Sequence, residues 1–396
     1  MKKLLVLAAG ILQIPVIKKA HDKGLYVIAV DGNPNAIGLQ YADKAIVANI
    51  TSEEEMLEIA FREKIDGVIH PCSEVSMNVM GRINDEMHLH GISRDTALRA
   101  TNKHLMREAF EAYGAPSPLS FCTDNIDEGY KLLLNIGGKV ILKPSRNSGS
   151  RGIAMVESNI TYSDYARLFD RSIRESRDHS VMIEQYVEGP EFSVEIIVWN
   201  GDTYVLQVTD KKTTEAPYFV ELGHSQPSLY PEEVVNSVRD AAMKGVKALH
   251  LNDCAAHAEV KYQDGKPYIM EIGARLGGDF ISTELTHLST GIDMVAAAID
   301  VALGIKPDFS KVSEPQGVAI RYFTPKPGMV KSIENIEELV RPDVYDAEIY
   351  VKPGDVVREV KSSLDRSGHI IVTSLSPMEA IMNAEKIISS VKIITE

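Results

Sequence analysis

Cysteine is scarce in this chain of 396 residues. The three cysteines, Cys72, Cys122 and Cys254, lie far apart and form no Cys-x-x-Cys pair. Disulfide frameworks and zinc sites both need paired or clustered cysteines, so the sequence suggests neither. We therefore expect a reduced, cytoplasmic protein.

Positive charge is also in deficit. The chain has 42 lysines and arginines against 56 aspartates and glutamates, which gives a formal net charge of -14. A negative chain repels phosphates, and phosphate contacts dominate binding to nucleic acids and acidic membranes. We expect no nucleic-acid partner, although a local basic pocket is compatible with this charge.

Apolar runs long enough to cross a membrane are missing as well. The first residues, MKKLLVLAAGILQIPVIKK, resemble a short signal peptide, but Gln13 interrupts the apolar stretch and a strand-like pattern follows directly. No other segment has the length that a bilayer crossing requires. We therefore expect no membrane partner.

Two familiar glycine patterns for nucleotides are incomplete. From Gly10 to Asp31 the spacing mimics a dinucleotide fingerprint, but only one of the three required glycines is present. The stretch ILKPSRNSGSRGI, residues 141–153, has the small residues of a phosphate cradle, yet Lys143 precedes its glycines, unlike the lysine of a P-loop. We interpret the N-terminal region as Rossmann-like without a bound dinucleotide, and a dehydrogenase is the weakest alternative.

The remaining pattern is that of an ordinary globular protein with two or three domains, since 44% of the residues are hydrophobic and 25% are charged. Residues 1–100 alternate apolar runs with amphipathic stretches, which predicts a parallel α/β unit with a capping box at Thr51 and Glu54. A helix that ends at Gly114 follows. We predict that residues 117–187 form a small module of helix, two strands around the serine- and glycine-rich loop, helix and strand.

Two hairpins are predicted further along the chain. Asn200-Gly201 and Asp264-Gly265 each separate two strand-like runs, and a long helix opening at Pro231 lies between the hairpins. From about residue 315 the pattern changes to short strands and a final helix in SPMEAIMNAEKIISS.

Two carboxylates lie on the arms of the second hairpin. If its loop takes three residues, Gln263 faces Pro267 and Glu259 faces Glu271, with Cβ atoms about 5 Å apart. Two negative charges at this distance repel each other unless a cation lies between them. Carboxylate oxygens are suitable ligands for Mg²⁺ that is held together with phosphates. A two-residue turn would instead place the pair on opposite faces, and a solvated charge ladder is the alternative interpretation.

The stretch EIGARLGGD continues from the second carboxylate. Arg275 lies four residues beyond Glu271 and is followed by Gly277 and Gly278. A carboxylate, a fixed cation and a backbone open to close approach suit the transfer of a phosphate group. Upstream, EQYVEGPEF contains further acids, which are equally compatible with a strand, a turn and a strand with exposed side chains.

The order of these motifs resembles the ATP-grasp superfamily of carboxylate-amine ligases. Lys103 at the start of a helix, VILKP with its loop, EQYVEGPEF, Glu259 and EIGAR follow one another over residues 100–290. TEAPYFVELGHSQPS, EIGARLGGD and the tail are most similar to L-amino acid ligases, which join free amino acids into dipeptides. The resemblance implies an α/β and α+β multidomain fold, with a Rossmann-like domain over 1–98, an ATP-grasp domain over 99–314 with a lid subdomain over about 117–187, and a C-terminal α+β module over 315–396.

The resemblance also implies roles for individual residues. The ATP-binding set comprises Lys103 and Lys143 on the phosphates, Ser148, Gly149, Ser150 and Gly152 in a flexible lid, Glu184, Gln185 and Val187 at the adenine, and Glu191 at the ribose. The metal ligands are Glu259 and Glu271, for Mg²⁺ with Mn²⁺ as an alternative. The catalytic and substrate set comprises Arg275 on the acyl phosphate, Gly277 and Gly278 beside it, and Glu221 and His224 on the amino acids.

One departure from the superfamily concerns the metal. Many ATP-grasp enzymes have Asn two residues after the second metal glutamate, where this chain has Gly273, so the number of Mg²⁺ ions stays open. His224 is also compatible with a purely structural role. Tyr218, Phe219 and Ser282 are expected in the walls of the substrate pocket.

We therefore predict an ATP-dependent ligase that forms an amide from a carboxylate and an amine through an acyl phosphate, releasing ADP and phosphate. There are two alternatives. One is an ATP-grasp ligase or carboxylase with a different acceptor, and the other is a non-catalytic ATP-binding regulator. The expected partners are small molecules. A homodimer is one option for the oligomeric state.

Overall fold

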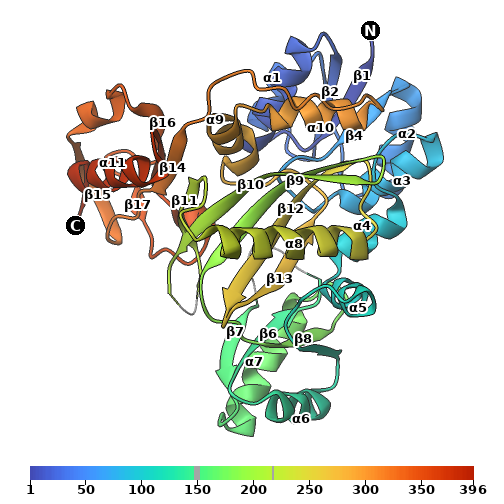
Figure 1. Cartoon of the computed structure of the whole chain (residues 1–396), viewed down its shortest axis with the longest axis vertical. Coiled ribbons are helices and arrows are strands. Elements are labelled where there is room, and N and C mark those ends of the chain that lie inside the picture. Colours follow the sequence, from blue (N-terminus) through green and yellow to red (C-terminus); the bar gives the residue numbers. More distant parts are fainter. Residues whose placement is uncertain (147–151, 216–217) are drawn as a thin grey trace.

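A computed structural model describes residues 1–146, 152–215 and 218–396. Within these ranges the strands form four sheets. Figure 1 shows a central sheet with the N-terminal unit above it, a small α/β unit below it and the C-terminal residues to one side. The predicted multidomain α/β and α+β fold class is confirmed.

The N-terminal sheet is parallel, with strand order β3-β2-β1-β4, and it is buried on both faces. Leu5 and Leu7 belong to the core on the side of α2, α3 and α4, whereas Leu4 and Val6 pack toward α1 and α10. Near-continuous apolar strands are typical of such doubly covered sheets. The elements are β1 (Lys3–Leu7), η1 (Ile11–Gln13), α1 (Ile14–Asp22), β2 (Tyr26–Asp31), η2 (Ile37–Tyr41), β3 (Lys44–Val47), α2 (Glu53–Glu63), β4 (Gly67–Ile69), α3 (Met77–Met87) and α4 (Arg94–Thr101).

The first turn of this unit is filled by the chain itself. Asp31, which mimics a ribose-binding acid, accepts hydrogen bonds from the backbone N–H groups of Ala9 and Asn33, both at 2.8 Å. Gly38 lies so close over the turn that a Cβ there would be 2.6 Å from the Ala9 oxygen. This geometry supports a Rossmann-like unit without a dinucleotide. The predicted capping box is wrong by one residue, because Ser52 caps α2.

The small α/β unit follows α5 (Lys103–Tyr113), which begins after the cap Asn102 and ends, as predicted, at Gly114 with φ 64°. Its antiparallel sheet has the order β5-β8-β6-β7. The first of these strands was not predicted, and it pairs with β8 at the edge of the sheet. The elements are β5 (Ser120–Thr123), α6 (Ile126–Ile136), β6 (Lys139–Pro144), β7 (Ala154–Glu157), α7 (Tyr162–Glu175) and β8 (Val181–Gln185).

The central sheet has an apolar face and a polar face. Along β9, Val194 and Ile196 pack in the core with α8, while Glu195 alternates to the other side. Along β12, Ala258 joins the same core and Glu259 faces away. The polar face therefore gathers the charged residues of several strands. The elements are β9 (Glu191–Trp199), β10 (Asp202–Thr213), β11 (Glu221–Gln226), α8 (Glu232–Ala248), β12 (Cys254–Gln263) and β13 (Lys266–Gly273).

The C-terminal residues extend this sheet, whose order is β13-β12-β9-β10-β11-β14-β18-β16. The sheet thus continues across the predicted boundary at 314, and the boundaries near 98 and 314 stay predictions. Helix α10, which precedes β14 in the chain, packs against α1 of the N-terminal unit (Figure 1). The elements are η3 (Ile281–Leu285), α9 (Thr286–Thr290), α10 (Met294–Ala302), β14 (Gly317–Tyr322), β15 (Gly328–Glu334), η4 (Ile336–Val340), β16 (Val344–Ile349), β17 (Val356–Val357), η5 (Ser363–Asp365), β18 (Gly368–Ser374), α11 (Pro377–Ser390) and β19 (Lys392–Thr395).

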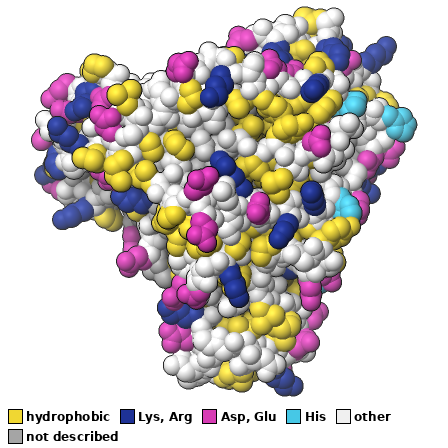
Figure 2. All heavy atoms as spheres, viewed as in Figure 1, with side chains coloured by type: hydrophobic (Ala, Val, Ile, Leu, Met, Phe, Trp, Pro, Cys, Tyr) yellow, Lys and Arg dark blue, Asp and Glu magenta, His cyan; other side chains and the backbone are white. Residues whose placement is uncertain are grey.

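The surface carries charges of both signs. On the face in Figure 2, Lys and Arg side chains are interspersed with Asp and Glu side chains and form no extended basic patch. Among the helices of the described ranges, none combines the length and apolarity needed to cross a membrane.

Candidate active site

The two predicted metal ligands face each other, but not by the predicted loop. The turn of the second hairpin contains two residues, Asp264 and Gly265, rather than three. Such a turn alone would set Glu259 opposite Met270. The register shifts by one residue at this point, so that Met270 forms a β-bulge and Glu259 pairs with Glu271. The predicted pair is thus confirmed by the register, and the predicted loop is wrong.

Helix α5 holds this bulge in place. Arg107 donates a hydrogen bond from Nη2 to the backbone oxygen of Met270 at 2.7 Å, and from Nε to Glu184 at 2.8 Å. One turn earlier, Lys103 Nζ lies 3.0 Å from Glu271 Oε1. Helix α5 therefore connects β13, which carries the predicted metal ligand Glu271, to the small α/β unit.

Glu184, Lys143 and Arg107 form a buried charged triad. The carboxylate of Glu184 is fully buried and lies 2.6 Å from Lys143 Nζ and 2.8 Å from Arg107 Nε. Burial opposes the charge of Glu184, but the two cations hold its pKa below the ordinary value. Burial lowers the pKa of Lys143 despite Glu184. Two cations against one carboxylate leave positive charge that an anionic phosphate would neutralise.

The predicted adenine-binding residues are partly engaged by the protein. Both carboxylate oxygens of Glu184 are held by cations. The Gln185 N–H donates to Leu119, and the Val187 oxygen accepts from Lys261 Nζ at 3.1 Å. The role of these residues at adenine stays a prediction.

We predict that Glu184→Gln destabilises the folded protein by about 3 to 5 kcal/mol, because it leaves buried cations without their counter-charge. Glu188→Gln is the control, since the Glu188–Lys139 pair is exposed and an exposed pair contributes about 0 to 1 kcal/mol. The folded pKa of Glu184 is depressed, so its contribution is present above the ordinary pKa of 4.5 and is lost as the pH falls below it. Urea unfolding of both variants across this pH range measures the effect, and equal losses in the two variants would contradict it.

Lys211 is a buried cation among three carboxylates, and no motif in the sequence indicates its role. It lies on β10, and its Nζ is 2.5 Å from Glu191, 3.3 Å from Glu259 and 3.9 Å from Glu221. These carboxylates overcome burial and raise the pKa of Lys211. In turn, the charge of Lys211 lowers the pKa of Glu259 well below its usual range. The excess of carboxylates leaves negative charge that suits a divalent cation.

A histidine lies beside Glu259, one of the two predicted metal ligands, on the same face of β12. His257 lies two residues before Glu259 on the same face of β12, with Nε2 3.8 Å from Glu259 and Nδ1 2.5 Å from Glu195. Burial lowers the pKa of His257, but the fully buried Glu195 carboxylate more than offsets this and raises that pKa to about 9. A Cβ at Gly277 would lie 2.6 Å from His257 Nδ1, so only glycine fits there.

Arg275 is held by a residue that the sequence did not single out. Its Nη2 lies 3.1 Å from Oε1 of Glu74, in the loop after β4. Burial and the nearby Glu271 raise the pKa of Glu74, whereas the positive charge of Arg275 acts to lower that pKa. Gly273, which stands where many ATP-grasp enzymes have Asn, lies close to this ion pair, since a Cβ there would be 3.2 Å from side-chain atoms of both Arg275 and Glu74. A larger side chain would crowd this ion pair.

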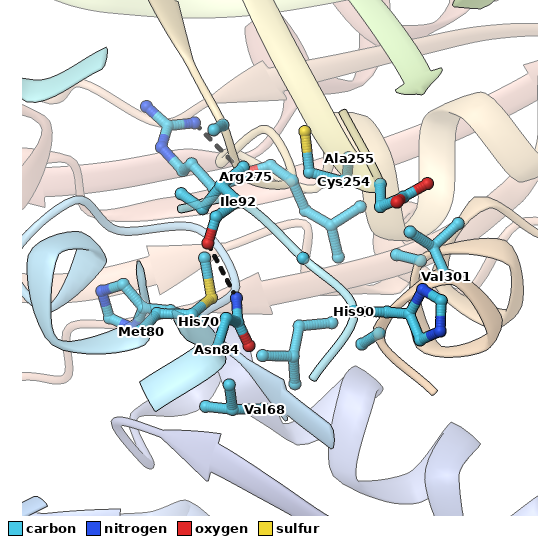
Figure 3. Close-up of a pocket in the computed structure, with 17 residues that line it drawn as sticks. Val68, His70, Met80, Asn84, His90, Ile92, Cys254, Ala255, Arg275 and Val301 are labelled. Atoms are coloured by element: carbon cyan, nitrogen blue, oxygen red, sulfur yellow. Dashed lines mark hydrogen bonds between the residues drawn. The ribbon is translucent and has the colours of Figure 1, made fainter. Parts of the chain in front are cut away.

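A cavity lies behind Arg275, between the N-terminal sheet and β12. Figure 3 shows its lining, in which Val68, His90 and Cys254 surround the space while the Arg275 guanidinium points away from it. Its volume is about 30 Å³, enough for a water molecule or two. An amino acid or a nucleotide does not fit there. His70 is structural, since it bonds the backbone of Leu7.

The predicted substrate residues Glu221 and His224 lie on one face of β11. Three residues apart in a regular strand, they would point to opposite faces, but a bulge between them brings both side chains to the same face. His224 Nε2 is 3.2 Å from Asp279, which Arg366 also binds. The ring centroid of Phe219 lies 6.1 Å from that of Tyr186, and the place of Phe219 in a pocket wall stays a prediction. Ser282 is not a wall, because it is buried and bonds Glu195 and Gly277.

The predicted lid residues of the ATP site fall partly outside the described ranges. Ser148, Gly149 and Ser150 lie outside the described residues. Gly152 is described, and it adopts φ 74° with Glu175 and Pro144 each 2.9 Å from the position of a Cβ. Only glycine fits this turn without strain.

Comparisons with known proteins agree with this geometry. Residues 136–284 match the protein family described as ATP-grasp domain. Residues 321–396 match the family described as L-amino acid ligase C-terminal domain 2. An uncharacterized protein, y4rH of Sinorhizobium fredii, is 24% identical over 79% of this chain and 65% of its own length. Alanine--anticapsin ligase of Bacillus subtilis is 26% identical over 64% of this chain and 58% of its own length. The chain thus spans less than two thirds of both relatives.

Solved structures share the whole fold. L-amino acid ligase from Bacillus licheniformis superposes with a TM-score of 0.84 at 21% identity, covering 100% of this chain and 99% of that one. Phosphoribosylglycinamide synthetase from Anaerococcus prevotii gives a TM-score of 0.80 at 24% identity, with 100% of both chains covered.

Residues 136–284 therefore form an ATP-grasp domain, and the predicted resemblance to that superfamily is confirmed. ATP-dependent, ADP-forming ligation by the whole chain stays a prediction, because the chain spans less than two thirds of these relatives. Within that superfamily, its C-terminal residues match the L-amino acid ligases. ATP with Mg²⁺ is the cofactor pair of ATP-grasp enzymes.

Proposed function

We propose that this protein joins amino acids into a dipeptide with ATP, releasing ADP and phosphate. The observation that carries the proposal is the division of charge between two clusters, one in the small α/β unit and one on the polar face of the central sheet. The triad around Glu184 has an excess of positive charge, and the cluster around Lys211 has an excess of negative charge. Arg275 is paired with Glu74 and also lies in the field of Glu271. Phosphates and a divalent cation would each neutralise one of these clusters.

The metal would be held by Glu259 and Glu271. Their opposed register and the negative charge around Lys211 fit Mg²⁺, with Mn²⁺ as the alternative. Among the residues that the structure describes, no group of three or more His, Cys, Asp or Glu could hold a metal by itself. Phosphate oxygens would therefore complete the coordination. The ion would supply neutralisation of the charge on the phosphates.

The reaction then has two steps. A substrate carboxylate oxygen attacks the γ-phosphorus, the bond to the bridging oxygen breaks, and an acyl phosphate and ADP form. A neutral amine attacks the acyl carbon, phosphate leaves, and the amine proton passes to solvent or to phosphate. Lys103, Lys143 and Arg275 would bind the negative charge that develops, which is mainly positioning and electrostatic catalysis.

The amino acids would bind beside Glu221 and His224. An ammonium group fits the carboxylate of Glu221, which is 28% exposed and faces the same space as Lys211. The name of the alanine ligase relative and the C-terminal match support amino acid substrates for this chain. The likeness to phosphoribosylglycinamide synthetase keeps a different acceptor as the second candidate.

A pairwise screen of amino acids tests this proposal. Phosphate release is measured for each pair, and products are identified by mass. We expect release that depends on at least one amino acid and a dipeptide of the matching mass. ADP formation that depends on a non-amino-acid amine would favour the second candidate, and ATP binding without turnover would indicate a regulator.

A further inference from the structure

The backbone next to the substrate residues is strained. Asp279 has φ 52° and Phe280 has φ 62°, so two consecutive residues with side chains adopt the left-handed conformation. The π-helix η3 follows immediately. Residues with side chains rarely adopt left-handed backbone, so surrounding contacts must hold it.

The C-terminal residues supply these contacts. Arg366 donates from Nη1 and Nη2 to the two oxygens of Asp279, each at 2.7 Å. The ring of His369 stacks on Phe280 with centroids 4.6 Å apart. Both strained residues are thus fixed from the segment that precedes and begins β18.

Arg366 is itself rigidly placed. Its guanidinium lies 3.7 Å from the centroid of the Tyr322 ring, and its Nε donates to the backbone oxygen of Ser363 at 2.8 Å. Ser363 in turn donates to Glu221 at 3.0 Å. The side chain of Arg366 is only 9% exposed, so water competes little with the hydrogen bonds that Arg366 makes.

Both predicted substrate residues are connected to Arg366. His224 shares Asp279 with it, and Glu221 accepts from Ser363 and, through its backbone oxygen, from Arg366 Nη1 at 3.4 Å. By contrast, the triad and the metal ligands make no described contact with Arg366.

We propose that Arg366 is a positioning residue for the amino acids, which holds the turn of residues 277–280 and the Glu221–His224 pair in the geometry that binds them. The part of this proposal that concerns substrates rests on the proposed function. The C-terminal residues thereby determine amino acid affinity, whereas nucleotide affinity is set elsewhere.

Arg366→Ala tests the proposal, with Arg341→Ala as the matched control. Arg341 also makes a two-pronged contact with an aspartate of the C-terminal region, at 2.9 and 3.1 Å from Asp343, but away from Asp279. We expect Arg366→Ala to raise KM for the amino acids by about 10- to 100-fold and to change KM for ATP by less than about twofold. Arg341→Ala should alter neither constant.

Hydrogen exchange provides a readout that does not depend on activity. Backbone amides of residues 277–285 should exchange faster in Arg366→Ala than in the wild type, and those of α8 should not. Arg366→Lys, which keeps the charge but not the two-pronged contact, should show an intermediate effect and serves if the alanine variant does not fold.

The outcomes separate the two proposals. Unchanged exchange in the turn, or an equal rise of both KM values, overturns the role of Arg366. Wild-type protein that releases no ADP with any amino acid overturns the proposed function, while faster exchange in Arg366→Ala would still support the structural part of the inference.

Discussion

Glu271→Gln is expected to abolish turnover, with kcat lowered by about 1,000-fold or more, while the fold stays intact. Glutamine keeps the volume of glutamate but loses the negative charge that would attract a divalent cation to the proposed metal site. Lys103 Nζ, which lies 3.0 Å from this carboxylate, would then face a neutral amide instead. At 25% side-chain exposure, Glu271 is open enough that the amide can be hydrated, so the stability should change little.

Glu348→Gln is the control, because Glu348 is an exposed glutamate on β16 of the same sheet. Steady-state rates are measured across a Mg²⁺ titration, with circular dichroism as the check on folding. Partial recovery at high Mg²⁺ would indicate weakened metal affinity. Full activity of Glu271→Gln at ordinary Mg²⁺ would show that this carboxylate is not a metal ligand.

Local patterns predicted the elements that local forces determine. Helix α5 ends at Gly114, which adopts the left-handed conformation that glycine favours. The hairpin of β9 and β10 turns at Asn200 and Gly201, both with positive φ. In each case the signal and the structure it specifies lie within a few residues of each other. The edge strand β5 was missed, since a short, half-buried strand has little alternation.

Bulges could not be read from the sequence. The opposition of Glu259 and Glu271 was predicted with a three-residue loop, whereas the structure combines a two-residue turn with a bulge at Met270. The choice between them depends on Arg107, which binds the bulged backbone from a helix far away in the chain. A tertiary contact therefore decides the register that the pattern of the hairpin leaves open.

The missed site residues share this property. Glu74, Lys211 and Arg366 come from three separate parts of the chain, and each acquires its role from a neighbour across the fold. One signal was available, because His257 precedes Glu259 by two residues and must share its face of a strand. The motif order could not reveal the others, because it records positions along the chain and not contacts between strands.

Arg275→Ala is expected to prevent formation of the acyl phosphate while ATP still binds. The arginine lies beside Glu74 and Glu271, where the proposed reaction would develop charge on the transferred phosphate group. Among the described residues, no hydrogen bond or ion pair joins it to the triad around Glu184. Hydroxylamine, as a small nucleophile, should replace the second amino acid in the wild type and give a hydroxamate together with ADP. We expect the variant to lower the hydroxamate yield by about 100- to 1,000-fold, with the Kd for ATP changed less than about threefold.

Two variants distinguish charge from packing at this position. Arg275→Lys keeps a cation but not the planar fork, and Glu74→Gln removes the partner of Arg275 while the arginine stays. If the cation acts through charge on the phosphate, Arg275→Lys should retain part of the hydroxamate yield that Arg275→Ala loses. Glu74→Gln should lower the hydroxamate yield less than Arg275→Ala does. Unchanged yield in Arg275→Ala would remove this residue from the reaction. Release of AMP and pyrophosphate by the wild type would show an adenylate instead of an acyl phosphate, because the attack would then have occurred at the α-phosphorus.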